Sequence, residues 1–353
     1  MSKEEGASSL GALRLPWLDA AVDATLAHQR GHATLLHASP GIGAFEFGLE
    51  LARGWLCEGV GRRPCGTCGS CRLIEGRVHP DLFVLLPEIQ RRERGWPLGD
   101  DKLDGEDAKR KPSRQIKIEA VRALIDWSTK TSARGRGKVA LLHPAEAINL
   151  FAASALLKTL EEPPGGTRLI LTAADPSALL PTVLSRCQRV RLPPPSAAEG
   201  TAWLAARSVA LPEALLAGCV GRPLDAWALA QAGVDGAAWA ALPGAVARGQ
   251  TQALSSWPVP TWLDALHKLC HDAMARCVGG STRYFAEADV PKAASLEALL
   301  AWARELDRVA RHADHPWNEG LLLDALVGQG RQALAPGALP ARERRQGADT
   351  LSS

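Results

Sequence analysis

The chain has 353 residues, 46% of them hydrophobic, and a formal net charge of +3. This length predicts two or three domains, and the small charge excludes a protein that binds nucleic acid through bulk electrostatics alone. No run of about 18 apolar residues is present and the start of the chain lacks the pattern of a secretory signal, so we expect a cytoplasmic protein with no membrane span.

The first part of the chain has the outline of a phosphate-binding loop. Residues 1–12 are expected to form a flexible tail, and residues 15–29 are compatible with a short helix. An apolar run over residues 32–38, typical of a buried strand, enters the turn Pro40–Gly43 and continues as an amphipathic segment to Cys57. A strand, a glycine loop and a helix in this order are typical of a P-loop, although an ordinary strand–turn–helix explains this segment alone equally well.

The residues after the glycines lack the chemistry of a working P-loop. Such a loop places a Lys after its last glycine, to contact the phosphates, and then a Ser or Thr that holds Mg²⁺. Here Gly41 and Gly43 are kept, but Ala44 and Phe45 stand at those two positions and Glu46 adds a carboxylate. We therefore expect neither ATP nor Mg²⁺ to bind this loop.

Four of the eight cysteines are clustered in the sequence. Cys57 is followed by Cys65, Cys68 and Cys71, and the last three are separated from one another by two residues that include a glycine. Four thiolates with this spacing are typical of a tetrahedral zinc site, and four protein ligands leave no open position, so its role would be structural. We expect a zinc module over residues 57–80. Free or disulfide-bonded thiols and an iron–sulfur cluster are the alternatives.

Beyond the cysteines, strand and helix patterns alternate. Strands are expected over residues 81–86, 138–142, 168–172 and 188–192, and helices over residues 116–130, 147–161 and 176–186. This alternation predicts an α/β domain with a parallel sheet covered on both faces. The segment from Glu88 to Arg114 is rich in both charges and is expected to be a mobile, solvated loop rather than a DNA-binding arm.

The composition changes at three consecutive prolines. We place the sheet domain over residues 1–195, ending at these prolines. No strand pattern comes after them, and helical spacing predicts a small lid domain over residues 196–240 and an all-helical collar domain over residues 241–330. Residues 331–353 are polar and are expected to form a flexible tail.

Further segments carry a resemblance to a known family. These are the sequence ALLKTLEEPP at residues 155–164, the triplet Ser185-Arg186-Cys187, and HPDLFVL, which starts at His79 after the cysteines. Together they resemble bacterial clamp-loader subunits of the AAA+ group over most of residues 14–195. The resemblance implies a RecA-like AAA+ sheet domain. The family contains ATP-hydrolysing motor subunits and a non-hydrolysing stator subunit.

A second loss favours the stator. The family's motor subunits carry an Asp-Glu pair at the end of the third strand, where this chain has His143 and Pro144. Thr172 stands where the family senses nucleotide and is interpreted here as a strand-end residue. The resemblance also implies that Arg186 is an arginine finger for nucleotide bound by a neighbouring subunit. The alternative is a surface arginine that caps its helix or pairs locally.

The resemblance thus implies a subunit of a heteropentamer that loads the sliding clamp during replication, as part of the replicative polymerase holoenzyme. The implied partners are the gamma/tau motor subunits, the clamp-opening delta subunit, the sliding clamp and primed DNA. The alternatives are a gamma/tau-type motor subunit with an aberrant loop and a zinc-dependent DNA-binding module. Glu161 and Glu162 point about 100° apart on a helix and are not interpreted as a catalytic pair. For His267 and His271 we favour packing over metal binding.

Overall fold

The computed structural model describes residues 13–97, 112–293, 295–312 and 318–335. The chain divides into two compact units, residues 1–194 and residues 195–353, and each is described separately below. The tail expected over residues 1–12 lies outside the described residues, as does most of the tail expected after residue 331.

The first unit is built on a five-stranded sheet. Its strands are β1 (Ala33–His37), β2 (Leu82–Leu85), β3 (Lys138–Leu142), β4 (Thr167–Ala173) and β5 (Gln188–Arg191). They pair in parallel in the order β2-β3-β4-β1-β5, with β1 inserted between β4 and β5. The predicted parallel α/β sheet is therefore confirmed, and its strand positions agree with the sequence patterns to within one or two residues.

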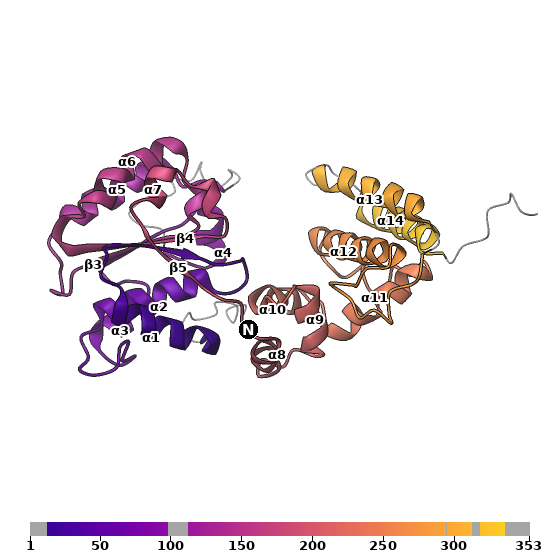
Figure 1. The fold of residues 1–353 in the computed structure, drawn as a ribbon, viewed down its shortest axis with the longest axis horizontal. Helices are drawn as coiled ribbons and strands as arrows, with labels where there is room; N and C mark the ends of the chain where they lie inside the picture. Colours follow the sequence, from indigo (N-terminus) through magenta and orange to yellow (C-terminus); the bar gives the residue numbers. More distant parts are fainter. Residues whose placement is uncertain (1–12, 98–111, 294, 313–317, 336–353) are drawn as a thin grey trace, which may run out of the picture. The chain divides into compact units, whose positions relative to one another are not determined.

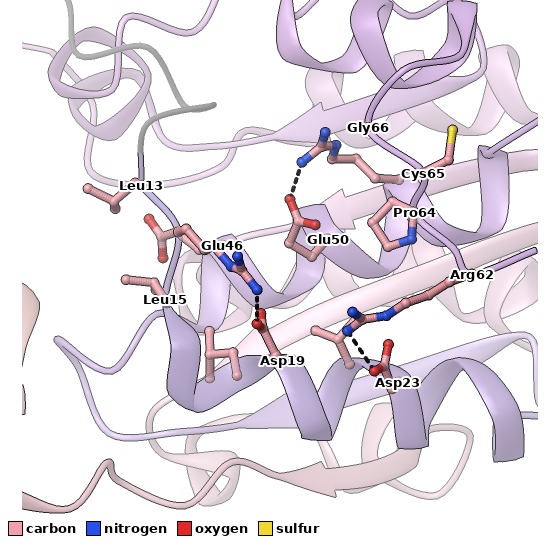
Figure 2. A pocket seen from close by; sticks show the side chains of 14 residues that line it. Leu13, Leu15, Asp19, Asp23, Glu46, Glu50, Arg62, Pro64, Cys65 and Gly66 are labelled. Atoms are coloured by element: carbon pink, nitrogen blue, oxygen red, sulfur yellow. Dashed lines mark hydrogen bonds and ion pairs between the residues drawn. The ribbon is translucent and has the colours of Figure 1, made fainter. Parts of the chain in front are cut away.

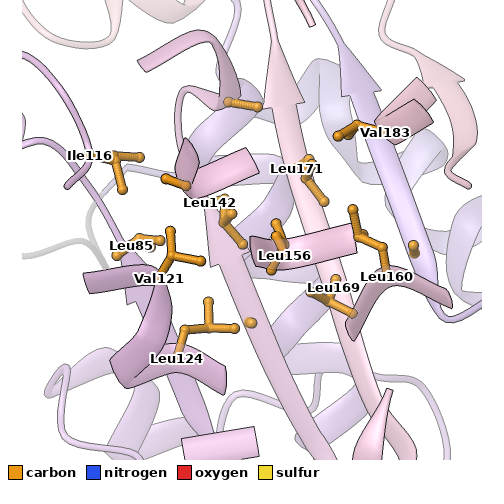
Figure 3. Packing of buried hydrophobic residues seen from close by; sticks show 14 of the residues in the cluster. Leu85, Ile116, Val121, Leu124, Leu142, Leu156, Leu160, Leu169, Leu171 and Val183 are labelled. Carbon is orange, nitrogen blue, oxygen red and sulfur yellow. The ribbon is translucent and has the colours of Figure 1, made fainter. Parts of the chain in front are cut away.

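Helices cover both faces of this sheet (Figure 1). One face carries α1 (Asp19–His28) and α2 (Ala44–Leu56), and the other carries α5 (Ile118–Thr129), α6 (Leu150–Glu161) and the short α7 (Pro181–Leu184). Leucine and valine side chains from the sheet, α5 and α6 form the core on the second face (Figure 3), including Leu85, Val121, Leu124, Leu142, Leu156 and Leu169. Each is nearly inaccessible to solvent, and burying such a side chain is worth about 1.5–3 kcal/mol.

The charged segment expected to be a mobile loop begins with ordered structure. Residues Glu88–Glu93 form helix α4, and the side chain of Trp96 is only 9% exposed. The prediction of a mobile loop was wrong for these residues, because Arg94 and Trp96 pack on Phe45 and Glu46 in the first turn of α2. Residues 98–111 lie outside the described part of the chain.

The described part of the second unit is entirely helical. Its helices are α8 (Ala197–Ala205), α9 (Pro212–Gly218), α10 (Pro223–Gln231), α11 (Gly236–Ala247), α12 (Val259–Cys277), α13 (Leu296–Arg311) and α14 (Glu319–Ala333). The predicted helical C-terminal region is confirmed. The expected boundary between lid and collar at residue 240 falls inside α11, which packs against both α9 and α14.

Aromatic stacking marks the centre of this unit. The ring of Trp239 on α11 stacks on Phe285, with 5.1 Å between centroids, and on Trp257, with 6.3 Å. Gly218 on α9 is required there, because a Cβ at this position would lie 2.5 Å from the Trp239 ring. In the residues that the structure describes, no helix is both long and apolar enough to cross a membrane.

Candidate functional site

The glycine loop keeps the backbone of a phosphate-binding turn. Gly41 and Gly43 have φ angles of 74° and 108°, which only glycine adopts easily. A Cβ on Gly43 would also lie 2.4 Å from a methyl group of Leu15. The indole of Trp17 donates a hydrogen bond of 2.9 Å to the carbonyl of Ile42 at the tip of the loop. The N-terminal segment therefore fixes the loop at the start of α2.

The side chains after the loop turn into the protein. Ala44 is the first residue of α2, and the ring of Phe45 is completely buried. The Phe45 centroid lies 5.2 Å from that of His143 and 5.9 Å from that of Trp96, in an edge-to-face arrangement with the indole. At the position where a P-loop needs a metal-binding hydroxyl, this chain has part of a small aromatic core.

Arg94 brings a positive charge to this core from the segment after α4. Its guanidinium carbon lies 4.4 Å from the Phe45 centroid, and its Nη1 donates a 2.9 Å hydrogen bond to the carboxylate of Glu46. The Glu46 side chain is only 10% exposed, so loss of Arg94 would leave a nearly buried carboxylate unpaired. The loop thus contacts a cation that belongs to the chain itself.

His143 completes the cluster from the end of β3. Arg94 Nη2 lies 3.4 Å from its Nε2, and its Nδ1 lies 2.7 Å from Thr172 Oγ1. Because Nε2 faces a donor, we assign the proton to Nδ1, which donates to Thr172. Burial, together with the charge of Arg94, lowers the pKa of His143 to about 3, so the imidazole is neutral at pH 7. Pro144 follows it directly.

The structure therefore brings together the altered residues that the sequence singled out separately. Phe45, Glu46 and His143 form one contact cluster, and Thr172 belongs to it. Sequence reasoning missed Arg94 and Trp96. The available signal was a tryptophan in a mostly polar segment, since a ring of that size favours burial.

The four clustered cysteines converge on one point. Cys57 ends α2, Cys65 lies in the loop after it, and Cys68 and Cys71 lie at the start of α3 (Gly69–Glu75). Their sulfur atoms all lie within 4.8 Å of one another, with 3.9 Å between those of Cys57 and Cys68. Four sulfurs around a tetrahedral ion with bonds of about 2.3 Å would be about 3.8 Å apart. The cluster is therefore compatible with zinc.

The surroundings of these sulfurs also suit a metal. Hydrogen bonds from the backbone of Thr67 and Cys68 lower the pKa of the Cys65 thiol to about 5, whereas burial raises the pKa of Cys71 to about 12. A buried thiol with a raised pKa loses its proton readily only when a cation compensates the charge. The backbone N–H groups of Gly59 and Cys65 also point at Cys57 Sγ, at 3.3 and 3.4 Å.

Arg186 lies between α7 and β5, and its guanidinium is held within its own chain. Nε donates to Glu161 Oε1 at 2.7 Å, Nη2 pairs with the same oxygen, and Nη1 donates to the carbonyl of Thr182 at 2.8 Å. The side chain is 31% exposed and that of Glu161 is 48% exposed. The local pairing that was weighed as an alternative is therefore present. Its partner is the first of the two glutamates that were not interpreted as a catalytic pair.

A separate cavity of about 290 Å³ lies beside the loop, between α1, α2 and the cysteine module (Figure 2). Glu46 and Cys65 both line it. Each arginine on its wall has a carboxylate partner: Arg14 pairs with Asp19 at 2.6 Å, Arg53 with Glu50 at 2.6 Å, and Arg62 with Asp23 at 2.8 Å. The arginine charges in this cavity are therefore neutralised by carboxylates that also line it.

Comparisons with known proteins point to one family. A family model described as DNA polymerase III, delta subunit, matches residues 21–196. The chain is 39% identical to DNA polymerase III subunit delta' of Pseudomonas aeruginosa over 218 residues, which are 58% of each chain. It is 30% identical to the Escherichia coli subunit delta' over 276 residues, which cover 72% of this chain and 76% of that one. The match to E. coli subunit tau is 36% identical but covers only 46% of this chain and 21% of the relative.

Proposed function

The chain belongs to the DNA polymerase III delta' subunit family, and on this premise we propose that it is the non-hydrolysing stator subunit of a clamp loader. In this role it would help to load the sliding clamp onto primed DNA during replication, in the cytoplasm. The chain spans only 58% of the length of the P. aeruginosa relative that it matches, so its activity and partners are stated here as parts of this proposal.

The observation that carries the proposal is the cluster around the glycine loop. A motor subunit needs room and ligands for Mg²⁺ and the terminal phosphates at this point. Here Phe45 is buried, Arg94 pairs with Glu46, and a neutral His143 stands where the motor's acidic pair would be. These described side chains satisfy one another, so the cluster that they form offers neither a metal ligand nor a free cation for phosphate.

The competing function is that of a gamma/tau-type motor subunit. Matches to tau subunits give it some support, although they are shorter than the matches to the P. aeruginosa and E. coli delta' subunits. Equilibrium binding of labelled ATP to the isolated chain separates the two. We expect no Mg²⁺-dependent binding at millimolar ATP, and micromolar binding would favour the motor subunit.

We further propose that Arg186 acts in trans on ATP bound by a neighbouring motor subunit. Its position after α7, its partial exposure and its location in a Ser-Arg-Cys triplet support this role. In the isolated chain Glu161 neutralises the guanidinium. Because this pair is partly exposed, its contribution is below about 1 kcal/mol, so assembly can exchange it for a phosphate contact.

The test is reconstitution of the loader with Arg186→Ala. An arginine finger contributes about 10³–10⁵ to the rate, so ATP hydrolysis at the adjoining site should become undetectable and the DNA-stimulated rate of the whole loader should fall. The matched control is Arg189→Ala, which removes the same charge three residues away. An unchanged rate in a correctly assembled Arg186→Ala complex would refute the trans role.

We propose that the four cysteines hold one structural zinc ion. Cys57, Cys65, Cys68 and Cys71 would each supply a thiolate, which leaves no position for substrate or water.

The lid and collar domains within residues 195–353 remain part of the proposal, with α11 joining them. The partners would be the motor subunits, the delta subunit, the sliding clamp and, through the complex, primed DNA.

A further inference from the structure

A second groove lies at the opposite end of the sheet from the glycine loop. It has a volume of about 370 Å³ and is lined by Leu26, Gly54, Trp55, Arg63, Gly135, Arg136 and Arg168. Arg168 is the second residue of β4, and Gly135 and Arg136 precede β3. The groove therefore opens at the amino ends of the parallel strands, whereas the glycine loop comes after the carboxyl end of β1.

The positive charge of this groove is not balanced by any carboxylate among the residues that line it. Three of its seven lining residues are arginines and none is acidic. Among the described residues, Arg63, Arg136 and Arg168 form no ion pair with a carboxylate. The cavity of Figure 2 differs in this respect, because its three arginines are each paired. We call this second groove the arginine groove.

Arg168 is the most constrained of the three. Its guanidinium carbon lies 4.8 Å from the Trp55 ring centroid, and its Nη1 is buried without any hydrogen-bond acceptor in the described structure. The indole face stabilises the cation but does not accept the Nη1 hydrogens in the plane of the guanidinium. A buried charged donor without an acceptor is costly, and burial accordingly lowers the pKa of Arg168. Arg168 thus lines the groove with a guanidinium whose donors are not all satisfied by the chain.

Hydrogen bonds hold the backbone of the loop that carries Arg136 in place. The buried carboxylate of Asp81 accepts hydrogen bonds from the backbone N–H groups of Ala133 and Arg134, at 2.7 and 2.8 Å. Gly135 next to Arg136 has a φ of 69°, which glycine adopts without strain. These contacts fix the backbone that leads into the tip, so the position of Arg136 over the groove is set by the fold.

We propose that the arginine groove is a binding site for a phosphate group. Guanidinium groups present paired donors that match the oxygens of phosphate, and three of them can surround a tetrahedral anion with several oxygens. A planar carboxylate has two oxygens and would leave part of this set unused. The phosphate could belong to a nucleic-acid backbone or be a free anion, and the groove geometry is shared by both. This site is independent of the proposed trans role of Arg186.

The test uses the full-length chain with two probes, a fluorescein-labelled dT12 oligonucleotide followed by anisotropy and inorganic phosphate followed by calorimetry. The variants are Arg136→Ala, which changes an exposed side chain and should not affect folding, and Arg168→Lys, which keeps the charge but removes the fork. The matched control is Arg122→Ala, an exposed arginine on α5. Charge-assisted hydrogen bonds are worth about 1.5–3 kcal/mol, so each groove variant should bind its probe at least about tenfold more weakly.

The outcomes separate the sources of the phosphate. Binding of both probes, with phosphate displacing the oligonucleotide, supports a nucleic-acid backbone as the ligand. Binding of inorganic phosphate alone supports a free anion. The proposal is overturned if neither probe binds at 0.15 M salt, if the groove variants bind like Arg122→Ala, or if a hexaglutamate peptide displaces phosphate at equal concentration, since the last result would identify a site for acidic peptides.

Discussion

At the scale of single residues, the glycine loop differs from a working P-loop by more than the two missing ligands. Phe45 is part of a core with His143 and Trp96, and Arg94 occupies the charged position above its ring. Restoring the lost residues would therefore also remove the ring on which this core is built.

This predicts the behaviour of an Ala44→Lys, Phe45→Thr double variant. We expect it to show no Mg²⁺-dependent binding of labelled ATP, because the acidic pair that would help to hold Mg²⁺ is still missing and the Glu46 carboxylate, paired with Arg94, still lies beside the loop. It should also be less stable by about 3 kcal/mol, the usual cost of truncating a buried phenylalanine. Equilibrium ATP binding and denaturant unfolding measure both effects. Micromolar ATP affinity in this variant would show that Ala44 and Phe45 alone prevent ATP binding in the natural chain.

His143 gives the first unit a specific acid sensitivity. Its pKa in the folded chain is about 3, below the ordinary value of 6.5. Between these two values the unfolded chain binds a proton that the folded chain does not, so stability falls as the pH decreases from about 6.5 towards 3. One and a half pH units correspond to about 2 kcal/mol, which is the loss expected between pH 6.5 and 5.

A His143→Gln variant should lack this part of the pH dependence, although it can be less stable at pH 7. The measurement is urea unfolding of the first unit at pH 5 and pH 7 for both proteins. The control is His28→Gln, which changes an exposed histidine on α1. Equal acid sensitivity in the wild type and His143→Gln would show that other groups dominate.

At the scale of elements, the hydrophobic pattern of the sequence was sufficient to predict the sheet and the helices that cover it. The runs that became β1, β3 and β4 are almost entirely buried, and such strands are recognisable as continuous apolar segments. Helix α4 was missed because five of its six residues, Glu88–Glu93, are polar or charged and none is buried. Its order comes from the next residues in the chain, because Arg94 and Trp96 pack on the first turn of α2. Local sequence does not encode such a long-range contact.

The cysteine module was predictable for a different reason. Ligand spacing is a local property, so the convergence of the four sulfurs could be inferred from the sequence, although α3 could not. The pairing of Arg186 with Glu161 was not predictable, because it joins the segment after α7 to the end of α6 across 25 residues.

The module makes a testable prediction about metal content. The purified chain should contain one zinc and no iron per molecule by elemental analysis. A Cys68→Ser variant should lose the metal and have a melting temperature lower by several degrees, since structural zinc contributes directly to folding. Cys277→Ser is the control, because this cysteine lies at the end of α12, outside the cluster. Full zinc retention in Cys68→Ser would exclude a four-cysteine site.

At the scale of the whole molecule, the chain consists of two units with separate cores. The first core lies between a sheet and helices, and the second is a helical packing centred on aromatic rings. Two cores in one chain imply that damage to one should leave the other largely folded.

Trp239→Ala tests this independence. Its ring is 1% exposed and stacks on Phe285 and Trp257, so truncation should cost about 3–5 kcal/mol within the second unit. Calorimetry should show an earlier transition for residues 195–353, while the Cys65–Cys71 region and the sheet melt as in the wild type. Trp55→Phe in the first unit, with its half-buried indole, is a mild control. A uniform shift of all transitions would indicate a single cooperative unit.

The pairing of Arg94 with Glu46 has a consequence for timing. A nucleotide and its Mg²⁺ dissociate and are replaced, so a loop that depends on them passes through several occupancy states in every cycle. A cation that is part of the polypeptide has no dissociation rate and no concentration dependence. A ligand shifts a conformational equilibrium only through its different affinities for the two states, and in the proposed stator role no nucleotide would exchange at this loop. We therefore expect the loop to keep the same conformation at every ratio of ATP to ADP. In the proposed clamp loader, nucleotide-dependent changes would then belong to the motor subunits.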